Sequence, residues 1–392
     1  MQREIWTENG LIQGTCVSEC EPVLDAFVEN FRSSAEVGAD LCIMRGDNTM
    51  VNLRGGYQSQ REDRPWSTDT LCVVHSCTKA ATALCAHRLL DQGDILLHEP
   101  VASYWPEFVQ NGKEKITIAM LLNHTAGLPA LRSSLKTGAY LDWHYMVEQL
   151  AAEEPFWEPG TRQGYHMTTF GWLVGEVVRR VSGQSLGAFF RTHFGEPMGL
   201  DFWIGLPVSE HGRVSRLHRW KPERGFQHAP FTRQLLAAPK SIQALAYFKN
   251  GGYKTDSKES YQCEFGAGGG IGNARALARL YAPLANKGIL DGARVFSEDQ
   301  VELMSATEVA GGQDMTLLMP SRFSYGFMKS MDNRYRPAGH IESCILGASA
   351  FGHAGAGGSL GFADVELGIS FGYVMNKMGP GILLNERGQQ LV

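Results

Sequence analysis

The chain has 392 residues, of which 43% are hydrophobic and 20% are charged, and its formal net charge is -5 at pH 7. This length can supply a buried core for one large domain or two ordinary ones, and the composition excludes a disordered chain. The mildly acidic balance excludes binding of nucleic acid or anionic lipid through overall charge.

The N-terminal segment, MQREIWTENGLIQG, lacks the continuous apolar run of a signal peptide, and no apolar run in the sequence approaches the length of a membrane span. We therefore expect a cytoplasmic protein without a membrane span. The eight cysteines have irregular spacing, which favours reduced, mostly buried thiols over disulfides. No set of histidines, cysteines and carboxylates has metal-ligand spacing, so we expect no metal and no cofactor.

Three elements are predicted near the start of the chain. Residues 38–46 (GADLCIMRG) and 49–57 (TMVNLRGGY) are β-like runs separated by a turn at 47–48, which is typical of a hairpin. An alanine-rich helix is expected at 76–90, and Gly93 is a helix stop signal.

The middle of the chain differs from its two ends. Several segments between 95 and 310 carry helical periodicity, whereas the last 70 or so residues are β-like in RFSYGFM, ASAFGHAGAGG, GFADVEL and GISFGYVMN. Strands at both ends around a helical middle predict a discontinuous α/β sheet domain, 1–94 with 311–392, and an inserted, mainly helical domain, 95–310. A ligand cleft is expected at the interface of the two domains.

The start of the alanine-rich helix carries a candidate nucleophile. In HSCTKAATAL, Ser76 precedes Lys79 by three residues, so both side chains lie on one face of a helix. A buried lysine without an acidic partner tends to lose its proton, and a free amine can then activate a hydroxyl. The same spacing recurs at Ser133 and Lys136, but in a polar stretch typical of a solvated loop.

A second candidate nucleophile is Ser359 in GGSLG, which matches the Gly-x-Ser-x-Gly elbow. That motif needs a strand before the serine and a helix after it. Because GFADVELGISFGYVMN follows and has a hairpin pattern, we expect Ser359 to be a turn residue.

Taken together, these segments resemble the serine β-lactamase-like hydrolases, a family with class C β-lactamases, D-alanyl-peptide hydrolases and family VIII esterases. The resemblance runs over most of the chain and rests on HSCTKAATAL, LLNHTAGLPAL, EPGTRQGYHMTTFGWLVGEVVRRVSGQSL, FGEPMGLDFWIGLP, GAGGGIGNARALARL and FGHAGAGGS. It implies a β-lactamase/transpeptidase-like fold, in which an antiparallel sheet flanked by helices comes from both termini and a helical domain is inserted.

The resemblance implies three catalytic residues. Ser76 matches the acylated nucleophile, Lys79 matches the lysine that shares its proton, and Tyr165 in GYHM matches the tyrosine that exchanges protons with the nucleophile and the leaving group. A phenol titrates near 10, so a neighbouring ammonium would have to lower the pKa of Tyr165 if it is to act as a phenolate.

The resemblance also implies a strand that lines the cleft. His353 in FGHAG, followed by Gly355, falls where the family has Lys-Thr-Gly or His-x-Gly, and the N-H of Ala356 joins that of Ser76 in an oxyanion hole. His166 is a further candidate for substrate contact, although packing behind the site is the favoured role. His124 is expected to fix its loop.

Two other matches are rejected. A literal Lys-Thr-Gly at 136–138 precedes Tyr165 and lacks strand context. The GAGGGIGNARAL segment suggests a phosphate loop but lacks its Gly-Lys-Ser/Thr ending, so a close-packed loop before a helix accounts for it better.

Departures from the family pattern favour one group of its members. β-Lactamases carry Tyr-x-Asn, whereas Met167 stands here in place of the asparagine, and His353 is not a fixed cation. Both changes weaken recognition of an acidic lactam and leave acyl transfer intact, as in family VIII esterases.

We therefore expect a serine carboxylesterase whose partner is a small-molecule ester with a short-chain or aryl group. The alternatives are a β-lactamase or D-amino-peptide hydrolase, an acyltransferase that uses the same acyl-enzyme, and, least favoured, a non-catalytic binding protein. The sequence leaves open the natural substrate, the oligomeric state and any redox role of Cys77.

Overall fold

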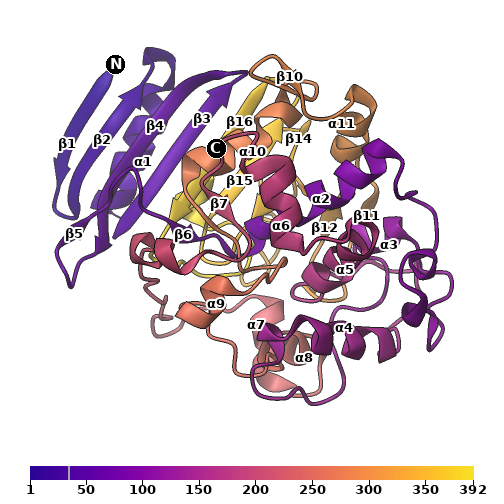
Figure 1. Ribbon diagram of the computed structural model, residues 1–392. Coiled ribbons are helices and arrows are strands. Elements are labelled where there is room, and N and C mark those ends of the chain that lie inside the picture. The colour runs from indigo at the N-terminus through magenta and orange to yellow at the C-terminus, as the bar shows by residue number, and fades with distance from the viewer. Residues whose placement is uncertain (34–35) are drawn as a thin grey trace.

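The computed structural model describes residues 1–33 and 36–392. Its main feature is an 11-stranded antiparallel sheet. Ten strands follow the order β1-β2-β4-β3-β16-β15-β14-β13-β12-β11, and the eleventh, β5, pairs with β4. Strands from the two ends of the chain meet where β3 pairs with β16, so the indigo and yellow strands of Figure 1 form one continuous sheet.

The strands of this sheet are β1 (Gln2–Thr7), β2 (Gly10–Cys16), β3 (Gly38–Arg45), β4 (Asn48–Ser59), β5 (Arg64–Pro65), β11 (Val309–Gly311), β12 (Ser321–Phe323), β13 (Met328–Lys329), β14 (Ala350–Ala354), β15 (Leu360–Asp364) and β16 (Ile369–Met375). Two small sheets contain β6 (Cys72–Val73), β7 (Phe202–Trp203) and β8 (Ile271–Gly272), and β9 (Ile289–Leu290) with β10 (Ala293–Arg294).

The helices are α1 (Glu21–Arg32), α2 (Thr78–Gln92), α3 (Ile118–Leu122), α4 (Trp143–Ala152), α5 (Phe170–Ser182), α6 (Leu186–Phe190), α7 (Pro230–Ala237), α8 (Ile242–Phe248), α9 (Lys258–Gln262), α10 (Ala274–Ala285), α11 (Glu298–Ser305) and α12 (Glu386–Gln389). Most of them lie to one side of the sheet, on the right in Figure 1.

The sheet is covered on both faces near its centre. Successive side chains of a strand point to opposite faces, and in β3 the side chains of Leu41 and Ile43 join the core that contains α1, whereas Cys42 and Met44 join the core that contains α10. Helix α10 lies so close to β16 that a Cβ on Gly372 would stand 2.2 Å from a carbonyl oxygen of the helix. Both faces of the central strands are therefore apolar.

Helix α2 runs through the protein interior. It contacts α5, α6 and β14, and its first ten residues are all buried. A helix that is buried on every side needs small or apolar residues all round, which accounts for its alanine-rich sequence. It ends at Gly93, whose φ of 78° is the left-handed conformation common after a helix C-terminus.

The antiparallel sheet with helices confirms the fold class expected from the sequence. The hairpin of β3 and β4 and the helix α2 lie where they were predicted. The strands β1 and β2 and the helix α1 were not anticipated. The division into domains at 94 and 310 stays a prediction, and α10, which precedes residue 310, packs on the sheet.

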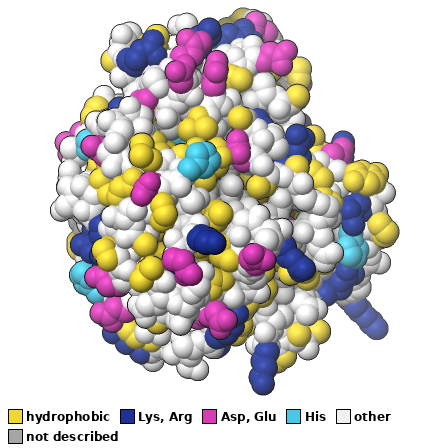
Figure 2. Space-filling model, turned by 90° about the vertical axis from the view of Figure 1, so that its right-hand side faces the viewer, with side chains coloured by type: hydrophobic (Ala, Val, Ile, Leu, Met, Phe, Trp, Pro, Cys, Tyr) yellow, Lys and Arg dark blue, Asp and Glu magenta, His cyan; other side chains and the backbone are white. Residues whose placement is uncertain are grey.

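The surface has a mixed character on the face shown in Figure 2. Dark blue and magenta side chains are interspersed there, without a large area of one charge sign among the described residues. No helix in residues 1–33 or 36–392 has the length and apolar character that crossing a membrane requires.

Candidate active site

Ser76 lies in a short 3-10 helix, His75–Cys77, that leads directly into α2. The preceding residue, His75, has a φ of 48°, a left-handed conformation that is uncommon for a residue with a side chain. Backbone strain of this kind costs about 1–3 kcal/mol and often marks a functional site.

Lys79 is fully buried one turn after Ser76. Its Nζ lies 3.2 Å from Ser76 Oγ and donates hydrogen bonds to the carbonyl oxygens of Met167 at 2.7 Å and Ala267 at 2.8 Å. Burial lowers the pKa of Lys79 well below its usual value, because desolvation penalises the ammonium. No carboxylate is among these hydrogen-bond partners.

A glycine-rich loop brings the Ala267 carbonyl to the lysine. Gly270 N donates to Thr78 Oγ1 at 2.7 Å, and a Cβ on Gly270 would stand only 2.5 Å from that oxygen. The glycines of GAGGGIG thus let the backbone lie directly against the start of α2. This confirms the interpretation of the segment as a close-packed loop before a helix, α10.

Tyr165 completes the group around Lys79. Its ring centroid is 4.8 Å from Lys79 Nζ, the residue is 2% exposed, and its hydroxyl forms no hydrogen bond of good geometry with any described residue. Burial raises the pKa of the Tyr165 phenol, and the nearby Ser76 hydroxyl offsets only part of that effect. The environment therefore favours a neutral phenol beside a neutral amine, rather than a phenolate beside an ammonium.

Asp314 holds the backbone of Tyr165. Both of its carboxylate oxygens accept from Tyr165 N, at 3.0 and 3.1 Å, and the residue is fully buried. Asp314 was not predicted from the sequence, because nothing in GGQDMTL marks it and the contact spans 149 residues.

His353 lies on β14 beside Tyr165. The two ring centroids are 5.9 Å apart, and the His353 carbonyl accepts from Cys77 Sγ at 3.1 Å. Its Nδ1 lies 2.7 Å from the Ala354 carbonyl, and its buried Nε2 has no partner among the described residues. Burial lowers the pKa of His353 to about 3, so the imidazole is neutral near pH 7.

The end of β14 lies against the segment that precedes Ser76. A Cβ on Gly355 would stand 2.3 Å from the carbonyl oxygen of Val74, so only glycine allows this approach. Within the described residues, no acceptor is hydrogen-bonded to the backbone N-H of Ser76 or of Ala356. Both N-H groups are therefore available for a ligand.

His166 is occupied by the backbone. Its Nε2 accepts from Leu128 N at 3.0 Å, its Nδ1 lies 2.7 Å from the Gly164 carbonyl, and the side chain is fully buried. Its backbone N donates to His124 Nδ1 at 3.2 Å. These contacts favour a packing role for His166 and a loop-fixing role for His124.

The alternative serine and lysine candidates from the sequence lie outside this group. Lys136 is half-exposed and pairs with Asp142 at 2.6 Å, and Ser133 bonds to Gln149 on the surface. Ser359 follows a turn and precedes β15 rather than a helix, which agrees with its interpretation as a turn residue.

The cysteines show no reactive thiol near Ser76. Each described cysteine is free, and burial raises the pKa of the Cys77 thiol. Since the thiolate is the reactive form, this environment disfavours oxidation of Cys77. No group of three or more potential metal ligands occurs among the described residues.

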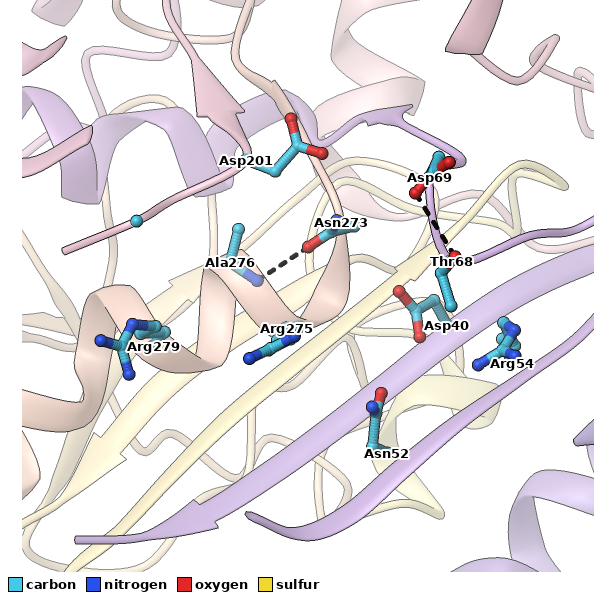
Figure 3. A pocket seen from close by; sticks show the side chains of 11 residues that line it. Asp40, Asn52, Arg54, Thr68, Asp69, Asp201, Asn273, Arg275, Ala276 and Arg279 are labelled. Carbon is cyan, nitrogen blue, oxygen red and sulfur yellow. Dashed lines mark hydrogen bonds between the residues drawn. The ribbon is translucent and has the colours of Figure 1, made fainter. Parts of the chain in front are cut away.

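A polar cavity of about 300 Å³ lies elsewhere in the molecule (Figure 3). Charged side chains line it, including Asp40 and Arg54 from the sheet and Arg275 from α10, and none of the candidate catalytic residues does. The Asp40 carboxylate accepts from the backbone N of Ala274 at the start of α10, which gives Asp40 a role in capping that helix.

Comparison with known proteins gives consistent results. The family model described as Beta-lactamase matches residues 24–390. Over 380 residues the chain is 31% identical to the esterase/beta-lactamase LipL of Mycobacterium tuberculosis, with 93% of this chain and 83% of that protein covered.

Two solved structures are similar over nearly the whole chain. A penicillin-binding protein homologue from Caulobacter crescentus has a TM-score of 0.86 and 34% identity, with 97% of each chain covered. A family VIII carboxylesterase has a TM-score of 0.83 and 35% identity, with the same coverage.

Proposed function

Because this chain belongs to the beta-lactamase family and is a serine hydrolase of that fold, we propose that it is a carboxylesterase that forms an acyl-enzyme on Ser76. Its substrates would be neutral esters with a short-chain or aryl group, and the reaction would need no cofactor.

The contacts of Lys79 carry this proposal. A neutral amine has two N-H groups and one lone pair, and two carbonyl oxygens, those of Met167 and Ala267, lie at hydrogen-bond distance from Nζ. With both N-H groups so occupied, the lone pair is left for the Ser76 hydroxyl, 3.2 Å away. Lys79 is thus arranged as the base that takes the serine proton.

The first half of the proposed reaction acylates Ser76. Ser76 Oγ attacks the ester carbonyl while its proton passes to Lys79, and the resulting oxyanion accepts from the N-H groups of Ser76 and Ala356. The bond to the leaving alcohol then breaks, its electron pair stays on the alcohol oxygen, and the phenol of Tyr165 supplies the proton. Lys79 returns the serine proton to Tyr165.

In the second half, water hydrolyses the acyl-enzyme. The same amine takes a proton from the water as its oxygen attacks the acyl carbonyl, and that proton passes to Ser76 as it leaves. The product acid and the starting form of the enzyme are restored, without a net gain or loss of protons in the site.

The preference for neutral esters rests on the charge state that the site favours for Lys79 and His353. Burial lowers the pKa of Lys79 well below its usual value and the pKa of His353 to about 3, which disfavours the cation that a substrate carboxylate would pair with. Met167 provides no amide, and its side chain packs against the apolar residues of α7 and α8. A β-lactam carboxylate would find no ion-pair partner among these residues.

Initial rates on p-nitrophenyl butyrate and nitrocefin test this choice. We expect ester turnover to exceed nitrocefin turnover by tenfold or more; the reverse ranking would favour a β-lactamase. A faster release of p-nitrophenol when a simple alcohol is added would favour an acyltransferase, and the absence of turnover on all substrates would favour a binding protein. A cytoplasmic location stays a prediction from the sequence.

A further inference from the structure

The carboxylate of Asp314 is held by neutral donors. It accepts from the backbone N-H groups of Tyr165, Thr316 and Leu317 and from the Ser321 hydroxyl, at 2.8 to 3.1 Å. A buried carboxylate is costly unless hydrogen bonds compensate it. The four hydrogen bonds compensate the burial of this carboxylate, and the carboxylate in turn fixes the backbone groups that donate to it.

This contact holds Tyr165 at its backbone N. The Tyr165 hydroxyl lies near the Ser76 hydroxyl but has no hydrogen bond of good geometry with a described residue. The ring stacks on Phe323, with centroids 5.9 Å apart and planes 6° apart. Asp314 and Phe323 lie on the loop before β12 and on β12 itself, so one segment holds both the backbone and the ring of Tyr165.

We infer that Asp314 is a positioning residue, which fixes the Tyr165 backbone so that the phenol can protonate the departing alkoxide. This inference rests on the proposed esterase function and goes beyond it, because Asp314 touches neither the substrate nor Ser76. Neither the sequence pattern nor the resemblance identified this residue.

The leaving group provides a specific readout. When the tetrahedral intermediate collapses, the carbon-oxygen bond breaks and the electron pair remains on the leaving oxygen. An alkoxide is strongly basic and needs the phenol proton at that moment, whereas p-nitrophenolate is a weak base and departs as an anion. A misplaced Tyr165 therefore slows alkyl esters far more than p-nitrophenyl esters.

The charge of Asp314 also favours the protonated form of the Tyr165 phenol. As an anion, Asp314 contributes to the raised pKa of Tyr165, after the larger effects of burial and of Cys77. The titratable groups around the phenol also include Lys79, His124 and His353, from three other segments. A protonated phenol is the form that can act as the acid.

The test measures kcat/KM, which reports acylation, on ethyl butyrate and p-nitrophenyl butyrate. Asp314→Ala removes the acceptor, and Asp314→Asn keeps one acceptor oxygen without the charge. Gln243→Ala is the matched control, because Gln243 Nε2 holds the same loop through hydrogen bonds to the Met315 and Thr316 carbonyls at 3.0 and 2.7 Å, rather than through Tyr165.

We expect Asp314→Ala to lower kcat/KM on ethyl butyrate by about 30-fold or more and on p-nitrophenyl butyrate by less than about threefold. Asp314→Asn should lie between this variant and the wild type. Gln243→Ala should affect both esters equally. If Asp314→Ala does not fold, Asp314→Asn carries the same comparison.

An equal loss on both esters in the Asp314 variants, or no loss on either, would overturn the inference. Tyr165→Phe separates this failure from a failure of the proposed function. If Tyr165→Phe selectively slows the hydrolysis of ethyl butyrate and the Asp314 variants do not, only the proposed role of Asp314 is wrong. If the wild type hydrolyses neither ester, the proposed function itself is wrong.

Discussion

Lys79 Nζ lies 3.2 Å from Ser76 Oγ, and the lysine side chain is fully buried. Two backbone carbonyls, rather than a carboxylate, occupy its other directions. A local sequence pattern, a serine and a lysine one turn apart, is thus combined with a long-range environment whose burial lowers the pKa of the amine.

The pKa of Lys79 should set the acid limb of the pH profile. The base works only as a free amine, so kcat/KM should rise with pH through the pKa of Lys79, and burial places that pKa well below 10.5. Lys79→Arg should lower kcat/KM by about 10²-fold or more, because a guanidinium stays charged. Activity that keeps rising up to about pH 10.5 in the wild type would contradict a buried neutral lysine.

His353 should contribute to catalysis and Lys136 should not. His353 lies beside Tyr165 with a free Nε2, whereas Lys136 is half-exposed and pairs with Asp142. We expect His353→Ala to lower kcat/KM by tenfold or more, about 1.4 kcal/mol, and Lys136→Ala to leave it nearly unchanged. Steady-state rates on p-nitrophenyl butyrate measure both effects, and the opposite ranking would favour the Lys-Thr-Gly at residues 136–138 over His353 as the match to the family's Lys-Thr-Gly.

Gly355 should be essential for the proposed oxyanion hole. In Gly355→Ala the new Cβ would stand 2.3 Å from the Val74 carbonyl oxygen, so the segment that carries the Ala356 N-H has to move. We expect a loss of about 10²-fold in kcat, as for removal of one oxyanion donor. Gly212→Ala is the control, since a Cβ there meets nothing within 4 Å. Equal activity of the two variants would count against Ala356.

The buried neutral imidazole of His353 should make folding sensitive to acid. Its pKa is lowered to about 3, so below about pH 6.5 the unfolded chain binds a proton that the folded protein does not, and stability falls as the pH falls. Relative to the wild type, His353→Asn should therefore gain on the order of 2 kcal/mol of unfolding free energy between pH 6.5 and 5.

Urea denaturation of both proteins at the two pH values measures this gain. The relevant quantity is the difference in unfolding free energy between the variant and the wild type at each pH. Asp40 and Glu342 have pKa values raised to about 6 and 7, so their titration in the same range changes the stability of both proteins with the opposite sign. Parallel pH dependence of the two proteins would mean that His353 is not held neutral.

The predictable part of the fold was the part with strong local signals. The β3–β4 hairpin and α2 follow from continuous apolar runs bounded by turn residues. Strand β1 was missed because it is an edge strand with no buried residue, so its pattern is weak. Helix α1 could have been found, since Leu24, Phe27, Val28 and Phe31 have helical spacing and are all buried.

In the candidate site, too, only the residues with a local sequence pattern were predictable from the sequence. The spacing of Ser76 and Lys79 on one helix face is local, so the residues themselves indicated it. The positions of Tyr165 and His353 came only from the resemblance, because chain folding brings them together over long separations. Asp314 and the two carbonyls around Lys79 were missed for the same physical reason: a backbone carbonyl has no sequence signature, and a lone aspartate in a loop has no local pattern.

The most direct test of the acyl-enzyme is intact-mass spectrometry after exposure to a fluorophosphonate. We expect one adduct per chain in the wild type, no adduct in Ser76→Ala, and a folded variant by circular dichroism. An adduct that persists in Ser76→Ala would contradict the assignment of the nucleophile and direct attention to Ser359.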